Sequence, residues 1–181
     1  MRIAPAAVGS FAWLVVAPGT VCGLVPWLIT GWTRPEQPHL LVDVLGVTLV
    51  LAGAGVMLHS FVAFAWHGRG TPAPAAPTEH LVVQGAYRHV RNPMYVAVVA
   101  LVLGQVLLFA SPGLFAYLVV ITLVTDAFVR TYEEPTLRDT YGPEYDQFRQ
   151  AVPRWVPRIT PWRGHPGSGL TTGQGAGVRR P

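Results

Sequence analysis

The segment from Gly85 to Tyr95 gathers most of the side chains in this sequence that could bind a charged ligand. It reads Gly-Ala-Tyr-Arg-His-Val-Arg-Asn-Pro-Met-Tyr and runs directly into an apolar stretch. Pro93 suits the first turn of a helix, because proline lacks an N–H that would be unpaired there in any case. The free N–H groups of that turn and the Arg91 guanidinium together suit a carboxylate or phosphate. Arginines before a membrane span also act as topology determinants that bind lipid headgroups, and this alternative stays open for Arg88 and Arg91.

A second group of charged residues lies at the end of the apolar sequence that follows. Asp126, Arg130, Glu133 and Glu134 are spaced at i, i+4, i+7 and i+8, which places them along one stripe of a continuing helix. If the intervening sequence forms a hairpin, this stripe returns to the level of Arg91. The sequence therefore predicts a pocket with arginine on one wall and carboxylates on the other. An ordinary ion pair between Asp126 and Arg130, and a solvated helix start at the two glutamates, are the structural alternatives.

The elements that must position these residues are apolar helices. Three stretches contain no Asp, Glu, Lys or Arg, namely Ile3 to Thr33, Val44 to Trp66 and Asn92 to Thr125. About 20 helical residues cross a bilayer core, so each of the first two stretches fits one span. The third is too long for one span, and Ser111-Pro112-Gly113 near its middle favours a turn between two antiparallel helices. We therefore predict an all-α integral membrane protein with about four transmembrane helices, at 6–30, 40–66, 93–110 and 114–132.

The remaining sequence divides into a polar helical segment and a tail. From Glu133 to Val152 apolar residues recur at helical spacing, which predicts a cytoplasmic amphipathic segment broken near Gly142-Pro143. We expect residues 1–162 to form one membrane domain, with residues 67–93 as its cytoplasmic cofactor loop. Residues 163–181 are rich in Gly, Ser, Thr and Pro and are predicted to be a disordered tail.

The distribution of arginine predicts the orientation. All thirteen basic residues are arginine, and with four spans and both termini on one side, twelve lie on that side and only Arg34 opposite. The positive-inside rule then places both termini and the loop in the cytoplasm, and the chain in the inner (plasma) membrane. Contact with anionic lipids explains the basic balance, and no nucleic-acid partner is expected. Cys22 is the only cysteine, so no intrachain disulfide or cysteine metal cluster is possible, and we expect no metal.

The motifs resemble a known family when they are taken in order. The Gly85–Tyr95 segment, the Glu133-Glu134 pair, Tyr-Gly-Pro-Glu-Tyr at 141–145 and Val-Pro-Arg at 152–154 resemble the isoprenylcysteine carboxyl methyltransferase family. That family is itself similar to the phospholipid N-methyltransferases, and the resemblance runs from about His80 to Pro157. It implies a helical membrane fold that binds S-adenosylmethionine at the cytosolic face and methylates a lipid-like or isoprenoid acceptor from the bilayer.

The resemblance also implies roles for particular residues. Arg91 and Glu134 are expected to be catalytic. The residues expected to bind the cofactor are His80, Gly85, Tyr87, Arg88, His89, Val90, Arg91, Asn92, Pro93, Tyr95, Glu133 and Glu134. The family commonly has Arg-His-Pro where this chain has Arg-Asn-Pro, so a titratable imidazole is missing at Asn92.

Methyl transfer from positively charged sulfur needs alignment and removal of water, and it does not require a nucleophile triad or a metal. A carboxylate, a thiol and an amine are all possible acceptors, and the oligomeric state is open. Two other functions fit less well. An NADPH-dependent reductase of the sterol-reductase type would favour asparagine where this chain has Met94. The best argument for a non-catalytic membrane protein, an assembly factor or lipid-binding scaffold, is Asn92.

Overall fold

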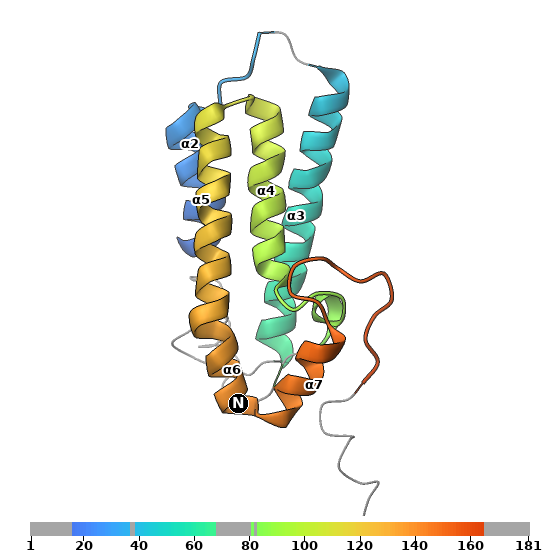
Figure 1. Ribbon diagram of the computed structural model, residues 1–181. Coiled ribbons are helices and arrows are strands. Elements are labelled where there is room, and N and C mark those ends of the chain that lie inside the picture. The colour runs from blue at the N-terminus through green and yellow to red at the C-terminus, as the bar shows by residue number, and fades with distance from the viewer. Residues whose placement is uncertain (1–15, 37–38, 68–80, 82, 165–181) are drawn as a thin grey trace, which may run out of the picture.

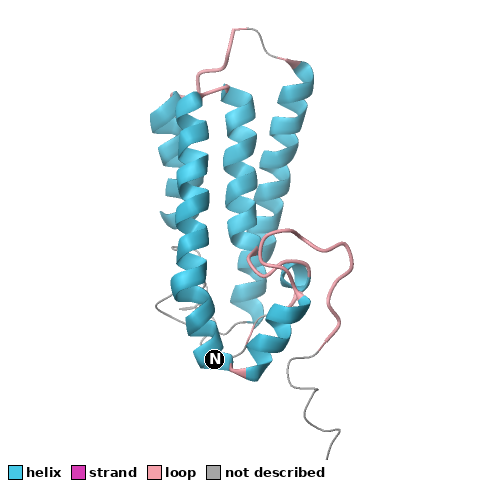
Figure 2. Ribbon diagram, in the orientation of Figure 1, coloured by secondary structure: helices cyan, strands magenta, loops and turns pink. Residues whose placement is uncertain are grey.

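The computed structural model describes residues 16–36, 39–67, 81 and 83–164 of the 181-residue chain. Within these ranges the regular elements are helices and no strand occurs, which confirms the all-α prediction for the described part. Figures 1 and 2 show long helices side by side, with the two short helices of the C-terminal part at the lower end. The start of the predicted span 6–30, residues 68–80 and 82 of the predicted loop, and residues 165–181 of the predicted tail lie outside the described residues. In chain order the elements are η1 (Thr20–Leu24), α2 (Val25–Thr30), α3 (Leu40–His67), η2 (Gly85–Arg88), α4 (Pro93–Phe109), α5 (Pro112–Phe128), η3 (Val129–Glu133), α6 (Glu134–Tyr141) and α7 (Pro143–Ala151).

Two helices in the described part are long and apolar enough to cross a membrane, fewer than the four predicted. They are Leu40–Val62 and the continuous helical stretch Pro112–Tyr141. Val16–Thr30 and Pro93–Phe109 are also apolar but shorter. The described part of the chain begins at Val16, and α4 comprises 17 residues. Exposed apolar side chains cover the outside of α3 and α5, so the fold is compatible with a membrane protein.

The predicted helical hairpin is confirmed as α4 and α5. Ala110 ends α4 in the left-handed region, with φ of 46°, and its N–H donates to the Val106 oxygen. Ser111 then caps α5, because its hydroxyl accepts from the Leu114 N–H at 3.3 Å. Pro112 occupies the first turn of α5, where a missing N–H costs nothing. The hairpin therefore returns the end of α5 to the level at which α4 begins (Figure 1).

Helix α3 packs closely against α4 through glycines. A Cβ added at Gly104 would lie 2.6 Å from the Gly46 carbonyl oxygen, and one at Gly53 would lie 2.9 Å from the Ala97 oxygen. Small residues at a helix interface allow such approach of two backbones. Gly55, by contrast, faces open space. The close packing fixes α3 beside the first turns of α4, where the candidate site lies.

Within the described residues, each of the two π turns ends two positions before a proline. η1 precedes the Val25-Pro26 pair that opens α2, and η3 precedes the Glu134-Pro135 pair that opens α6. A proline ring collides with the carbonyl four residues back and offers no N–H to it. We attribute the wider i→i+5 turns, such as that from the Val25 N–H to the Thr20 oxygen, to this conflict.

Side chains of the hairpin satisfy the carbonyls that Pro26 leaves without a helical donor. The Tyr117 hydroxyl donates to the Val21 oxygen at 3.0 Å, and Gln105 Nε2 donates to the Cys22 oxygen at 2.9 Å. These bonds connect the helical stretch Val16–Thr30, which we call the first helix, to α5 and α4. A buried carbonyl without a partner is costly in an apolar setting, so the two polar side chains compensate for the proline.

Removing either donor should loosen the first helix. We expect Tyr117→Phe and Gln105→Leu each to lower the free energy of unfolding by about 1 kcal/mol, because a carbonyl inside the bundle loses its hydrogen bond. Reversible unfolding in mixed detergent micelles measures this. Tyr132→Phe is the matched control, since the Tyr132 side chain is half exposed and its ring contact with Phe128 persists in the variant. Equal losses from Tyr117→Phe and the control would contradict the role given to Tyr117.

Candidate functional site

A cavity of about 460 Å³ lies among the helices, near the N-terminus of α4. This volume is within the range of roughly 300–1,000 Å³ that is typical of small-molecule sites. The first helix, α3, α4, α5, η2 and η3 all contribute to its walls. The lining residues are Ala17, Pro18, Val21, Met57, Phe61, Tyr87, Arg91, Asn92, Pro93, Met94, Tyr95, Val98, Thr125, Phe128 and Glu133.

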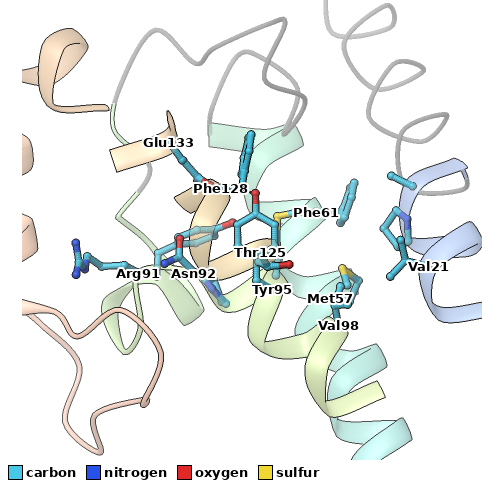
Figure 3. A pocket seen from close by; sticks show the side chains of 15 residues that line it. Val21, Met57, Phe61, Arg91, Asn92, Tyr95, Val98, Thr125, Phe128 and Glu133 are labelled. Carbon is cyan, nitrogen blue, oxygen red and sulfur yellow. Dashed lines mark hydrogen bonds between the residues drawn. The ribbon is translucent and has the colours of Figure 1, made fainter. Parts of the chain in front are cut away.

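Most of the cavity wall is apolar. Met57 and Phe61 come from α3, Val98 comes from α4, and Phe128 comes from α5 (Figure 3). Met57 and Phe61 are buried and pack against the first turns of α4 through Met94 and Val98. Such a surface suits a hydrocarbon chain or a flat ring system.

The polar end of the cavity lies where η2 and η3 approach the first turn of α4. The Tyr95 hydroxyl donates to Glu133 Oε2 at 3.0 Å, and Figure 3 shows the Glu133 side chain directed toward the other labelled side chains. Tyr87 lines the same end, and burial raises the pKa of its phenol well above the usual value, so it stays neutral. A carboxylate among aromatic rings, including that of Phe128, is an environment that favours a cationic group.

A buried ion cluster lies behind this polar end. Arg91 Nη1 donates to Glu134 Oε1 at 2.8 Å, and Arg154 Nε and Nη2 donate to the same carboxylate, both at 2.7 Å. Side-chain exposure is 10% for Arg91, 10% for Glu134 and 22% for Arg154. The Glu134 carboxylate holds the pKa of the Arg154 guanidinium above its ordinary value, so the cluster stays charged at neutral pH. Arg91 also donates to the Tyr145 hydroxyl at 3.4 Å.

The Arg91 side chain connects the cluster to the cavity. Arg91 is among the lining residues, yet Figure 3 shows its guanidinium end turned away from the other labelled side chains. Its Nε is buried and has no hydrogen-bond partner within the described residues. Arg91 therefore lines the cavity with the stem of its side chain, while its terminal nitrogen is engaged by Glu134.

The four charged residues that were expected on one helical stripe separate into three groups. Asp126 and Arg130 form the expected i,i+4 ion pair at 2.7 Å, and Trp155 Nε1 donates to Asp126 at 2.8 Å. η3 interrupts the regular helix, so the predicted stripe does not continue through it. Glu133 then binds Tyr95 at the cavity, whereas the adjacent Glu134 joins the ion cluster. The prediction of a single charged stripe was wrong because the π turn changes the angular position of the residues that follow.

Arg154 reaches the cluster on a segment that we call the C-terminal strap, residues 152–162. The strap runs along the segment that carries Arg91. Its backbone bonds, each 2.9 Å, join Arg91 N–H to Pro153, Arg158 N–H to His89 and Trp162 N–H to Arg88. Arg88 Nε also donates to the Trp162 oxygen, and His89 Nδ1 lies 2.8 Å from the Arg158 oxygen. Arg88 and His89 thus hold the strap, and their predicted contact with the cofactor stays a prediction.

Gly85 fixes the approach of η2 to α3. Its φ is +55°, a region that side chains disfavour, and an added Cβ would collide with the His59 imidazole. We expect Gly85→Ala to lower the free energy of unfolding by more than about 1 kcal/mol and to weaken ligand binding, because η2 carries Tyr87.

Gly55→Ala is the control for Gly85→Ala, because Gly55 lies on α3, the helix that carries His59, and faces open space. Adding His59→Ala should recover part of the loss by removing the collision while leaving the cost of the backbone conformation. Thermal unfolding of the three variants in detergent tests this. A Gly85→Ala protein as stable as the Gly55→Ala protein would contradict the packing argument.

The structure brings together about half of the predicted site residues. Those that line the cavity are Tyr87, Arg91, Asn92, Pro93, Tyr95 and Glu133. Glu134 lies in the ion cluster, and Gly85, Arg88, His89 and Val90 are outside the lining. His80 lies outside the described residues.

Sequence reasoning did not assign a role to Arg154 or to the α3 residues Met57 and Phe61. The Val-Pro-Arg motif at 152–154 was the signal that could have identified Arg154, because it is one of the motifs on which the family resemblance rests. No local pattern distinguishes Met57 and Phe61 from other apolar residues of α3. No group of His, Cys, Asp or Glu suited to a metal ion was found among the described residues.

Comparison with known proteins identifies the family. The family model described as phospholipid methyltransferase matches residues 41–144, more than half of the chain, from α3 to the start of α7. No curated protein and no solved structure matches the chain. The cavity residues from α3, η2, α4, α5 and η3 all lie within the matched range, whereas Arg154 and the strap lie beyond it. On the extent of this match, the chain belongs to the phospholipid methyltransferase family.

Proposed function

We propose that this protein transfers a methyl group from S-adenosylmethionine to a lipid-like acceptor at the cytoplasmic face of the membrane. Family membership supports methyl transfer to a lipid-like molecule. The observation that carries the proposal is the convergence of Glu133, Tyr95, Tyr87 and Phe128 at one end of an otherwise apolar cavity. This arrangement suits a cationic cofactor beside an apolar acceptor.

The residues of the polar end fit the functional groups of S-adenosylmethionine. When bound, the cofactor supplies a methyl carbon that positive sulfur has activated. Glu133 would hold the cofactor's ammonium or ribose hydroxyls, and the rings of Tyr87 and Tyr95 suit its positive charge. Asn92 Nδ2 donates one N–H to the Arg154 oxygen at 3.3 Å, and its second N–H would suit the cofactor's carboxylate at the cavity edge.

Arg91 and Glu134, which we expected to be catalytic, act in this proposal mainly by holding the wall of the site. Glu134 accepts three hydrogen bonds from two guanidinium groups, so its negative charge is already compensated within the wall. The work of this protein's own residues is to align the two ligands and exclude water, which is sufficient for an in-line displacement. If the acceptor is an amine, Glu133 is the carboxylate at the cavity that could accept its proton.

The acceptor would enter from the bilayer with its apolar part along Met57, Phe61 and Val98. This surface suits an isoprenoid or acyl chain and presents no charged group to it. The reacting end, a carboxylate, thiol or amine, would then face Tyr95 and Glu133.

Four spans with cytoplasmic termini complete the proposal. Besides the two long apolar helices, α4 and the first helix would also cross the membrane. The twelve arginines that would then share one side support a position of the cavity's polar end at the cytoplasmic face of the inner (plasma) membrane.

Equilibrium binding of labelled S-adenosylmethionine to the full chain in lipid nanodiscs tests the cofactor. We expect the wild type to bind and Arg91→Ala to lose binding at least tenfold, because the Ala variant removes part of the cavity wall and leaves Glu134 with one partner fewer. Arg138→Ala is the matched control, since the Arg138 side chain is 59% exposed and its ion pair with Asp146, at 3.3 Å, is longer than the pairs of Glu134. A folded wild-type protein that binds no S-adenosylmethionine would contradict the proposal.

The alternative functions have their own outcomes in the same experiments. Thermal stabilisation by NADPH and not by S-adenosylmethionine would favour the reductase. Binding of S-adenosylmethionine without transfer of a methyl group to extracted lipids, as measured by mass spectrometry, would favour the scaffold.

A further inference from the structure

Two apolar side chains of the C-terminal strap point away from the protein. Val156 is 74% exposed and Ile159 is 97% exposed. The backbone between and beside them is fixed, because the Arg158 N–H donates to the His89 oxygen and Arg158 Nη1 donates to the Ala151 oxygen at 2.7 Å. A fixed backbone that presents branched apolar side chains outward marks a contact surface.

The strap lies at the depth where two apolar helices end. Trp155 packs against Tyr95 in the first turn of α4, with ring centroids 6.5 Å apart. Its indole N–H donates to Asp126 in the last turn of α5. Figure 1 shows the strap rising beside the lower end of α4. Val156, the next residue, therefore lies at the edge of the apolar bundle and not on its polar cap.

The charges of this region match an anionic surface. Residues 152–164 contain Arg154, Arg158 and Arg163 and no Asp or Glu. Arg154 is committed to Glu134, whereas Arg163 is exposed. Apolar side chains flanked by arginine and tryptophan are typical of segments that lie in the lipid interface, where the headgroups are anionic.

We propose that the C-terminal strap is a membrane-interface contact, in which Val156 and Ile159 insert among the lipids beside α4, and Arg163, directly after the strap, meets anionic headgroups. The inference rests on the membrane placement in the proposed function, but not on methyl transfer. The same strap carries Arg154 to Glu134 and accepts the Arg91 N–H at Pro153. Lipid contact on its outer side thus supports the wall of the cavity on its inner side.

Spin-label accessibility in vesicles of phosphatidylcholine and phosphatidylglycerol in equal amounts tests the contact. In a Cys22→Ser background, Val156→Cys and Ile159→Cys are labelled with a nitroxide, one at a time. Leu51→Cys, from a 67% exposed position within α3, is the lipid-facing control, and Gln147→Cys, exposed on α7, is the water-facing control. Collision with oxygen, which concentrates in lipid, is compared with collision with a water-soluble nickel chelate.

We expect the ratio of oxygen to nickel accessibility at Val156 and at Ile159 to exceed that at Gln147 several-fold and to approach that at Leu51. A ratio equal to that at Gln147 would overturn the inference. Low accessibility to both reagents would also overturn it, because the strap would then be covered by protein. A label at Leu51 that behaves as if in water would instead overturn the membrane placement itself, which separates the two failures.

Discussion

Replacing Glu134 by glutamine is expected to lower the free energy of unfolding by about 3 kcal/mol. Glu134 neutralises Arg91 and Arg154 at 2.7–2.8 Å, and all three side chains are largely buried. Breaking a buried ion pair by removing one partner typically costs about 3–5 kcal/mol, because the remaining charge is left uncompensated. We use the lower end because the Arg154 side chain is 22% exposed and part of its charge reaches solvent.

Reversible unfolding in mixed detergent micelles measures the effect of Glu134→Gln. Glu144→Gln, in the first turn of α7 and outside the ion cluster, should cost less than about 1 kcal/mol. Arg154→Gln should fall between the two, because Arg91 still pairs with Glu134. If Glu134→Gln is as stable as Glu144→Gln, the cluster does not hold the site together.

Glu133→Gln is expected to have the opposite profile, with S-adenosylmethionine binding weakened roughly ten- to hundredfold and stability nearly unchanged. Within the described residues Glu133 accepts one side-chain hydrogen bond, from Tyr95, and its carboxylate faces the cavity. A hydrogen bond to a charged group contributes about 1.5–3 kcal/mol, which corresponds to that range of affinity. The amide keeps the size of the side chain and an acceptor for Tyr95, so little folding energy is lost.

Binding isotherms and unfolding curves of the same preparations separate the two glutamates. Tyr95→Phe is a useful companion, because it frees the Glu133 carboxylate without removing its charge, and it should weaken binding less than Glu133→Gln. A Glu133→Gln protein that binds as tightly as the wild type would exclude Glu133 from the cofactor site. The paired variants therefore decide which of two adjacent acids meets the ligand.

The sequence was sufficient to locate the helices and the break between the last two. Proline and glycine at 111–113 predicted the hairpin, and Gly142 with Pro143 predicted the boundary between α6 and α7, where Gly142 has φ of +52°. Such signals are local: a missing N–H or a left-handed φ constrains the backbone wherever it occurs. The count of spans was less secure, since α4 has 17 residues and is near the lower limit for crossing a bilayer.

The sequence alone determined which residue types form the site and at which end of the helical bundle they lie. Charge-free runs and a hairpin bring Arg91 to the level of Glu133 and Glu134, because antiparallel helices of similar length end together. Which acid faces the cavity was decided only in three dimensions. The π turn before Pro135 separates Glu133 from Glu134, and the strap returns Arg154 to a carboxylate 20 residues earlier. The spacing pattern assumed a regular helix and so missed the change in helical angle that Pro135 causes. The contact of Arg154 with Glu134 depends on packing between distant segments, which a short pattern does not encode.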